Sequence, residues 1–284
     1  YGDHRDLHRL IRRQRQMCIR DRLYVAILKS PYAHAKILNI DTSAAESLSG
    51  VEAVVTYKDI NDFPVKIISE TDEGFGPYGG IADAHFLDDE VMYVGDEVAA
   101  IAAISQQIAE EALELIRVKY KILPAILNMK DAKKPGAPKL TNKGNVFVRN
   151  KLQWGKGLEA FDEAKYIFED EMTFSSIQAG FIEPNAYIFE WFGNNLEIKC
   201  KTQDPWRDHV IISQFLKLPL NRISVDGYPS GGTFGGIHQG LCRALYITAV
   251  LSKKVAKPVC FVASRQETMT LNALKHRGKL YNKI

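Results

Sequence analysis

The sequence predicts an α+β chain of two domains, and three observations lead to this prediction. The length of 284 residues leaves room for two domains of about 150 residues each. The apolar fraction of 46% and the charged fraction of 25% are typical of a globular protein, which excludes a disordered, collagen-like or coiled-coil chain. Short β-rich runs alternate with segments of helical period, and stretches rich in Gly and Pro separate them.

Residues 1–22 differ from the rest of the chain. They hold seven Arg and three Asp, and they show neither an apolar period nor a signal-peptide core. Their sequence resembles the translation of a transposase-based sequencing adaptor, so we expect an artefactual, disordered tail that takes no part in the fold. A basic targeting helix and a nucleic-acid-binding arm are the competing interpretations. The adaptor interpretation implies that the natural N-terminus is missing, and that the C-terminus is open to the same truncation.

Without this tail the chain is close to electrically neutral. Removing its seven Arg and three Asp from the totals of 37 Lys and Arg and 34 Asp and Glu leaves 30 basic and 31 acidic side chains. We therefore expect no basic patch and no nucleic-acid partner. No run of about 18 apolar residues occurs, so a membrane span is not predicted.

Residues 23–128 are predicted to form the first domain. Its strands are expected where apolar and β-branched residues run together, over Leu23–Leu28, Ala35–Ile40, Val51–Tyr57, Val98–Ile104 and Arg117–Tyr120. Ser105 is a suitable N-cap for a helix over Gln106–Ile116, whose apolar residues recur at helical spacing, and a short helix is expected over Ser43–Leu48. Residues 70–90 are rich in Gly and Asp and predict a long loop.

Residues 129–144 are predicted to be a linker because Pro and Gly cluster there, and residues 145–284 are predicted to form the second domain. Its strands are expected over Tyr166–Phe174, Ala186–Trp191, Leu196–Cys200, Arg222–Val225 and Val259–Val262. One helix is expected to begin at Pro205, directly after Asp204. A second helix is expected to follow a glycine-rich turn and to run past Leu251.

This glycine-rich turn, Ser230–Gly236 with the sequence SGGTFGG, is a candidate binding site. Glycines between a strand and a helix let the backbone approach a ligand closely and leave free N–H groups at the positive end of the helix. The spacing matches neither the dinucleotide-binding fingerprint nor a P-loop, because no Gly-Lys-Ser/Thr follows. Taken alone, the turn is equally typical of a helix packed tightly on a sheet.

Further segments occur together with this turn in the order and spacing of one family. They are Tyr93–Ala100 (YVGDEVAA), Val118–Tyr120 with Leu123–Ala125, and Thr202–Pro205 (TQDP). On these segments the chain resembles the molybdenum-binding large subunit of the xanthine dehydrogenase and aldehyde oxidase family. The resemblance implies an α/β hammerhead-like domain over residues 23–128, followed by the first part of a molybdopterin-binding α/β domain over residues 145–284.

The resemblance also implies a reaction, a set of cofactors and a set of partners. The family hydroxylates an electron-poor carbon of an N-heterocycle or an aldehyde with oxygen from water, at a molybdenum-molybdopterin cofactor. Electrons then pass through iron–sulfur clusters to FAD, on partner subunits or domains. The family's catalytic glutamate lies beyond position 284, so we expect no catalytic residue and no metal ligand here. The expected partners are the remainder of the molybdenum subunit, the iron–sulfur subunit, the FAD subunit and a small-molecule substrate. The expected location of the protein is the cytoplasm.

Cofactor contacts carry over to the glycine turn, residue by residue. The positions that match the family's motif are Gly231, Gly232, Phe234, Gly235 and Gly236. Thr233 replaces the third glycine of the motif, which is tolerable only if this residue does not need a positive φ. His238 stands where xanthine-oxidising members have a substrate-contacting glutamate, so we expect a substrate contact there but not a purine in particular. The alternative for His238 is a hydrogen bond to backbone in the first turn of the helix.

A second family segment is matched by Ile177–Pro184, with the sequence IQAGFIEP. In the family its glutamine hydrogen-bonds an oxygen ligand of the metal, so Gln178 is a candidate cofactor contact. Gln178 is one residue closer to Glu183 than the family spacing requires, so either the strand contains a bulge or the contact is lost. A polar residue at a strand end is the competing interpretation.

Cysteine usage and two alternative functions complete the prediction. Cys200, Cys242 and Cys260 form no C-x-x-C pair and no zinc pattern, which indicates reduced, buried thiols of an intracellular protein.

A truncated or naturally split molybdenum hydroxylase subunit, inactive alone, is the first hypothesis. A non-enzymatic α/β module that binds a phosphate-bearing ligand at the turn is the second, and a structural scaffold is the third. The first hypothesis predicts an exposed apolar edge within residues 145–284.

Overall fold

The structure is a computed structural model. It describes residues 22–60, 86–140, 144–146, 149–228, 230–236, 243–271 and 275–284. The predicted tail up to residue 21, most of the predicted loop at 70–90, His238 and Cys242 therefore lie outside the described residues.

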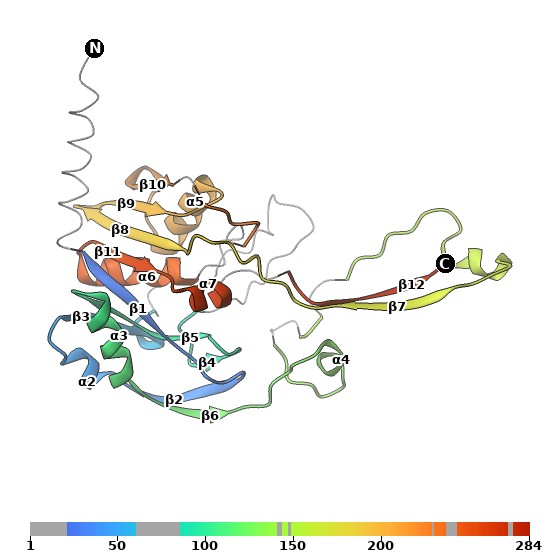
Figure 1. The fold of residues 1–284 in the computed structure, drawn as a ribbon, viewed down its shortest axis with the longest axis horizontal. Helices are drawn as coiled ribbons and strands as arrows, with labels where there is room; N and C mark the ends of the chain where they lie inside the picture. The colour runs from blue at the N-terminus through green and yellow to red at the C-terminus, as the bar shows by residue number, and fades with distance from the viewer. Residues whose placement is uncertain are drawn as a thin grey trace, which may run out of the picture.

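A seven-stranded mixed sheet forms the body of the molecule (Figure 1). In spatial order its strands are β10 (Ile223–Gly227), β9 (Asn195–Cys200), β8 (Ala186–Phe192), β11 (Val259–Val262), β1 (Leu23–Lys29), β5 (Glu97–Ala103) and β3 (Val51–Thr56). β1 pairs in parallel with β11, where Leu23 lies opposite Val259. The two predicted domains therefore contribute strands to one continuous sheet.

One face of this sheet is covered by the elements that follow β1 and β5. A second sheet of three strands lies beyond it, in the order β4 (Glu90–Val91), β2 (Ala35–Asp41) and β6 (Arg117–Ile122). Helices α2 (Ser43–Glu46) and α3 (Gln106–Leu115) pack in the same apolar cluster as β2 and β5, through residues such as Ala109 and Ala112. The predicted cap of α3 is confirmed, because the Ser105 side chain accepts a hydrogen bond from the Ile108 amide at 3.2 Å.

The opposite face carries helices α5 (Pro205–Leu216) and α6 (Arg243–Val255). Phe86 and Leu87 belong to this second apolar cluster, and the Phe86 ring lies 5.6 Å from the Phe215 ring and 5.7 Å from the Tyr246 ring, centroid to centroid. The segment predicted as a loop over 70–90 thus ends in the core, because an apolar pair follows its glycines and fills the space between the two helices.

The remaining elements are short. They are the 3-10 helices η1 (Tyr57–Asp59), η2 (Gly157–Glu163) and η3 (Leu220–Arg222), the helices α4 (Met129–Ala132) and α7 (Arg265–Leu271), and the strands β7 (Glu169–Phe174) and β12 (Gly278–Lys283). The predicted strand from Tyr166 begins three residues later, and α4 is a single helical turn inside the predicted linker. The sequence predicted neither α7 nor β12, since one has seven residues and the other is largely polar.

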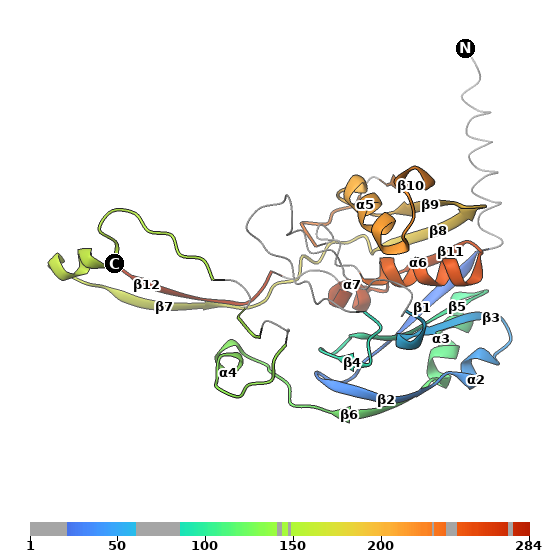
Figure 2. The same ribbon diagram turned by 180° about the vertical axis from the view of Figure 1, so that it is seen from behind.

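β7 and β12 form a two-stranded ribbon that projects from the body (Figures 1 and 2). Because paired residues share a face, Met172 lies beside Leu280 and Phe174 lies beside Gly278 on one side. On the other side, Lys279 forms an ion pair with Glu171 at 2.5 Å, and a second pair lies next to it. All six residues of β7 are exposed, and the apolar side chains of Met172, Phe174 and Leu280 are about half exposed. The large apolar edge expected from the first hypothesis stays a prediction.

Among the helices that the structure describes, none combines the length and the apolar character needed to cross a bilayer.

Candidate functional site

The glycine turn joins β10 to the segment that leads into α6. Its left-handed backbone conformations fall at Gly232 (φ +107°), Phe234 (φ +47°) and Gly235 (φ +84°). Thr233 is not among the described residues with positive φ. The replacement of the family's third glycine by Thr233 is therefore tolerable, because this position does not need a left-handed backbone. The amide of Gly236 donates to the carbonyl of Thr233 at 2.7 Å and closes the turn.

The turn has one packed side and one open side. A Cβ atom on Gly236 would lie 2.9 Å from a ring carbon of Phe181, and one on Gly231 would lie 3.0 Å from the Cβ of Glu183. Among the described residues, a Cβ on Gly235 would meet nothing within 4 Å, although its φ disfavours any side chain. Phe234 beside it is 78% exposed. An open glycine backbone next to an exposed aromatic ring fits one wall of a cofactor site.

The packed side of the turn is formed by residues 181–183. The carboxylate of Glu183 accepts a hydrogen bond from the Gly231 amide at 2.5 Å. The ammonium of Lys201, which follows β9, donates to the Glu183 carbonyl at 2.5 Å and lies 3.4 Å from the Glu183 carboxylate. Burial lowers the pKa of Lys201, and the Glu183 carboxylate opposes this shift. The Gly231 amide is thus engaged within the chain.

Helix α7 holds the same segment from another direction. The guanidinium of Arg265 donates to the carbonyls of Phe181, at 2.6 Å, and of Ile182. The side-chain amide of Gln178 donates to the Met269 carbonyl at 2.9 Å, and its oxygen accepts from the Ala179 amide at 2.8 Å. Both polar groups of Gln178 therefore contact backbone in this structure.

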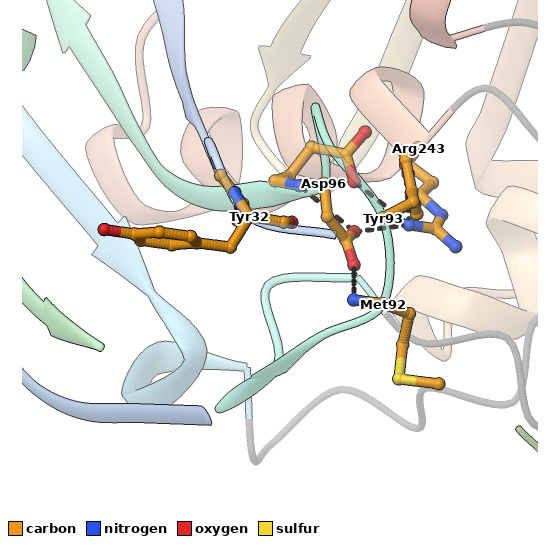
Figure 3. A network of polar contacts seen from close by, with 7 residues as sticks. Tyr32, Met92, Tyr93, Asp96 and Arg243 are labelled. Atoms are coloured by element: carbon orange, nitrogen blue, oxygen red, sulfur yellow. Dashed lines mark hydrogen bonds and ion pairs between the residues drawn. The ribbon is translucent and has the colours of Figure 1, made fainter. Parts of the chain in front are cut away.

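A polar network anchors the start of α6, which follows the turn (Figure 3). The Arg243 guanidinium donates to Asp96 at 2.6 Å, to the hydroxyl of Tyr93 at 2.9 Å and to Glu97 at 3.3 Å. The other carboxylate oxygen of Asp96 accepts from the Met92 amide at 2.8 Å. The segment Tyr93–Ala100, which carries part of the family resemblance, therefore contacts α6, the helix that follows the glycine turn.

Burial controls the protonation of this network. Glu97 is 1% exposed, and one of its carboxylate oxygens has no hydrogen-bond partner among the described residues. Burial raises the pKa of Glu97 to about 7, the Arg243 guanidinium opposes the shift, and the Asp96 carboxylate adds to it. Burial also raises the pKa of Asp96. Two buried carboxylates thus share one guanidinium, and Glu97 changes its charge near neutral pH.

The structure brings together the candidates of the turn and adds neighbours that the sequence did not single out. Sequence reasoning gave no site role to Glu183, Lys201 or Arg265, although the Glu-Pro pair of Ile177–Pro184 was a signal for the first of them. No group of three or more His, Cys, Asp or Glu suited to a metal ion occurs among the described residues. Cys200 and Cys260 are free and buried, as predicted, and burial raises the pKa of Cys200 to about 12.

Comparison with known proteins assigns both halves of the chain. Residues 15–124 match the model of the aldehyde oxidase and xanthine dehydrogenase a/b hammerhead domain, and residues 140–284 match that of the molybdopterin cofactor-binding domain. A hammerhead domain followed by a molybdopterin-binding domain defines one class of protein, the molybdopterin-dependent oxidoreductases. Within this class, the protein belongs to the xanthine dehydrogenase and aldehyde oxidase family, as the sequence resemblance implied.

Individual relatives agree with this assignment. The chain is 30% identical over 267 residues to a probable xanthine dehydrogenase subunit from Bacillus subtilis, a match that covers 91% of this chain and 33% of that protein. It is 30% identical over 261 residues to the nicotinate dehydrogenase large molybdopterin subunit of Eubacterium barkeri, covering 90% of this chain and 58% of that protein. The chain therefore spans about a third to three fifths of the length of these relatives.

A solved structure supports the same fold. The chain is similar to quinoline 2-oxidoreductase from Pseudomonas putida 86, with a TM-score of 0.74 and 25% sequence identity. The match covers 94% of this chain and 34% of that chain. The predicted hammerhead-like domain and partial molybdopterin-binding domain are thus confirmed as the fold.

Proposed function

We propose that the chain is part of the molybdenum-binding subunit of a molybdenum hydroxylase, and that the turn Gly231–Gly236 forms one wall of its molybdopterin site. The observation that carries the proposal is the open glycine flank at Gly235, next to the exposed ring of Phe234, inside a molybdopterin cofactor-binding domain. Molybdopterin, when bound, supplies the metal centre for oxygen transfer and electron uptake. The protein residues bind and orient it, and exclude water from it.

The roles proposed for single residues follow from which groups are free. Gly232 and Gly235 give the turn the backbone shape that presents its amides, and Phe234 provides an apolar contact. Gly231 and Gly236 set the position of the turn from its packed side. For Gln178 to contact an oxygen ligand of the metal, its amide has to leave the Met269 carbonyl. His238 remains the proposed substrate contact.

The proposed substrate class is an N-heterocycle or an aldehyde, hydroxylated with oxygen from water. A relative named for nicotinate, an electron-poor N-heterocycle, covers most of this chain, as does one named for xanthine. A histidine at position 238 donates or accepts a hydrogen bond according to its protonation, which suits a ring nitrogen as well as a carbonyl oxygen.

We propose that this chain alone does not turn over substrate and acts with partner chains. Three of its relatives are named as subunits, and the chain corresponds to only part of their length. The remainder of the molybdenum subunit, an iron–sulfur subunit and an FAD subunit are the proposed partners. The exposed apolar face of the β7–β12 ribbon supports a missing neighbour. The free, buried thiols of Cys200 and Cys260 support a location in the reducing cytoplasm.

The experiment that tests this function is a content analysis of the protein purified with the products of its neighbouring genes. Molybdenum, pterin and nucleotide are measured per chain, and the expected result is pterin together with molybdenum. Bound nucleotide or phosphate without pterin would instead support the non-enzymatic module. A stably folded protein with no ligand at all would support the scaffold.

A further inference from the structure

A single carboxylate connects the glycine turn to the rest of the fold at its first amide. The Glu183 carboxylate accepts the hydrogen bond of the Gly231 amide at 2.5 Å, across 48 positions of the sequence. The Cβ position of Gly231 lies only 3.0 Å from the Glu183 Cβ, so the two backbones approach each other closely. A charge-assisted hydrogen bond of this kind is shorter and stronger than one between neutral groups.

The position of Glu183 depends in turn on Lys201. This lysine is 4% exposed, and a buried ammonium is stable only beside a counter-charge. Its Nζ atom lies 2.5 Å from the Glu183 carbonyl, 3.4 Å from the Glu183 carboxylate and 4.1 Å above the centroid of the Phe181 ring. Lys201 therefore fixes both the backbone and the side chain of Glu183.

The segment that carries Glu183 touches the turn at a second point. Phe181 is fully buried, and its ring fills the space where a side chain at position 236 would be. Arg265 donates to the carbonyls of Phe181 and Ile182, which prevents the segment from sliding relative to α7. Residues 181–183 thus contact the first and the last glycine of the turn, and leave Gly235 open between them.

We propose that Glu183 is a positioning residue, held by Lys201, that sets the orientation of the glycine turn and so the direction in which its open side faces. Glu183 engages the Gly231 amide and the Thr233 carbonyl engages the Gly236 amide, which leaves the amides between them for a ligand. The ligand itself, molybdopterin, rests on the proposed function. The contact between Glu183 and Gly231 does not.

Amide hydrogen exchange of the full chain, read by mass spectrometry on peptides that contain residues 230–236, tests this role. Glu183→Ala removes both the acceptor and the counter-charge, and should speed exchange of the turn by about tenfold or more. Glu183→Gln keeps an acceptor oxygen but removes the counter-charge of Lys201, so its exchange rate should fall between that of Glu183→Ala and that of the wild type. Glu52→Gln, which alters an ion pair with Lys257 elsewhere on the sheet, is the matched control and should change nothing.

Lys201→Met provides the second arm, because it leaves Glu183 intact but unanchored. Lys201→Met should speed exchange of the turn. Adding Glu183→Ala to Lys201→Met should raise the exchange rate by a smaller factor than Glu183→Ala does in the wild type. Protection of peptides from β5 reports global folding in every variant. If Glu183→Ala does not fold by this criterion, Lys201→Met and Glu183→Gln decide. Wild-type exchange of the turn in Glu183→Ala or in Lys201→Met, or strict additivity of the two changes, would overturn the proposal.

Pterin content of the enzyme purified with its partner subunits separates this inference from the function on which it rests. Faster exchange in Glu183→Ala, with loss of pterin relative to Glu52→Gln, supports both. Faster exchange in a protein that contains no pterin even as wild type keeps the positioning role and rejects the proposed function. Unchanged exchange in a protein that contains pterin rejects the positioning role and keeps the function.

Discussion

The strand β5 and the ribbon β7–β12 differ in how far their apolar side chains are buried. All seven residues of β5 are buried, between the two apolar clusters of the body. The ribbon also has an apolar face, with Met172 paired beside Leu280, but that face is exposed. An apolar strand is stable where both of its faces are covered, whereas a two-stranded ribbon needs packing from elsewhere. The apolar residues of β5 are therefore covered within the body, whereas those of the ribbon have no cover among the described residues.

The largest expected effect sharpens this comparison directly. Ile101→Ala, in the centre of β5, should lower the free energy of unfolding by about 2–5 kcal/mol, because it leaves a cavity in a closely packed core. Leu280→Ala on the ribbon should change it by about 0.5 kcal/mol or less, since the side chain is already half exposed. Denaturant unfolding of the full chain measures both. Equal losses would mean that the ribbon is packed as well as the core.

A smaller effect concerns the buried carboxylate of Glu97 and the change of stability with pH. The raised pKa of Glu97, about 7, means that the folded chain keeps a proton that the unfolded chain releases near pH 4.5. Glu97 therefore lowers stability as the pH rises from about 4.5 to about 7, by up to ~1.4 kcal/mol per pH unit. Glu97→Gln should remove this part of the slope.

The variant is compared with the wild type across the pH range by denaturant unfolding, so that the contributions of other carboxylates cancel. Asp96 shares the Arg243 guanidinium with Glu97, so the difference between the two proteins reports the titration of the pair. Identical slopes for the two proteins would contradict the assignment of a neutral Glu97 in the folded state.

The smallest of these effects is at a helix end. Ser105→Ala removes the side-chain acceptor of the Ile108 amide and should cost about 1 kcal/mol. Thr42→Ala is the matched control, because the Thr42 hydroxyl accepts no cap hydrogen bond and makes only an exposed bond to the Glu46 carboxylate, at 2.7 Å. Thermal unfolding of the two variants side by side measures the difference. A cost for Thr42→Ala as large as that for Ser105→Ala would show that the cap contact is not the cause.

The sequence predicts the elements of the body well, because local signals define them. Continuous apolar runs mark β5 and β11, and Ser105 and Asp204 mark the starts of helices. β12 escapes prediction because its pattern is that of an exposed strand with alternating polar residues, and its partner β7 lies about a hundred residues earlier. The parallel pairing of β1 with β11 is equally non-local, so the shared sheet could not be read from either segment.

The candidate site divides in the same way. The glycines and Phe234 are recognisable as a motif, and the condition on Thr233 follows from backbone sterics alone. What fixes the turn is not local, since Glu183 contacts it from 48 positions earlier, and Lys201 and Arg265 hold the segment that carries Glu183. Likewise, nothing in the sequence near Arg243 indicates its pairing with Asp96, 147 positions away. Side chains that position a motif are found only once the fold brings them together.

The most direct test of the proposed cofactor site compares two glycines of similar backbone and different location. Gly235 and Gly193 both have positive φ, +84° and +60°, and no atom of the described residues lies within 4 Å of either Cβ position, but Gly193 lies in the β8–β9 hairpin. Gly235→Val should abolish pterin binding in the enzyme purified with its partners, whereas Gly193→Val should retain it. Equal pterin content in the two variants would contradict the assignment of the molybdopterin site to the glycine turn.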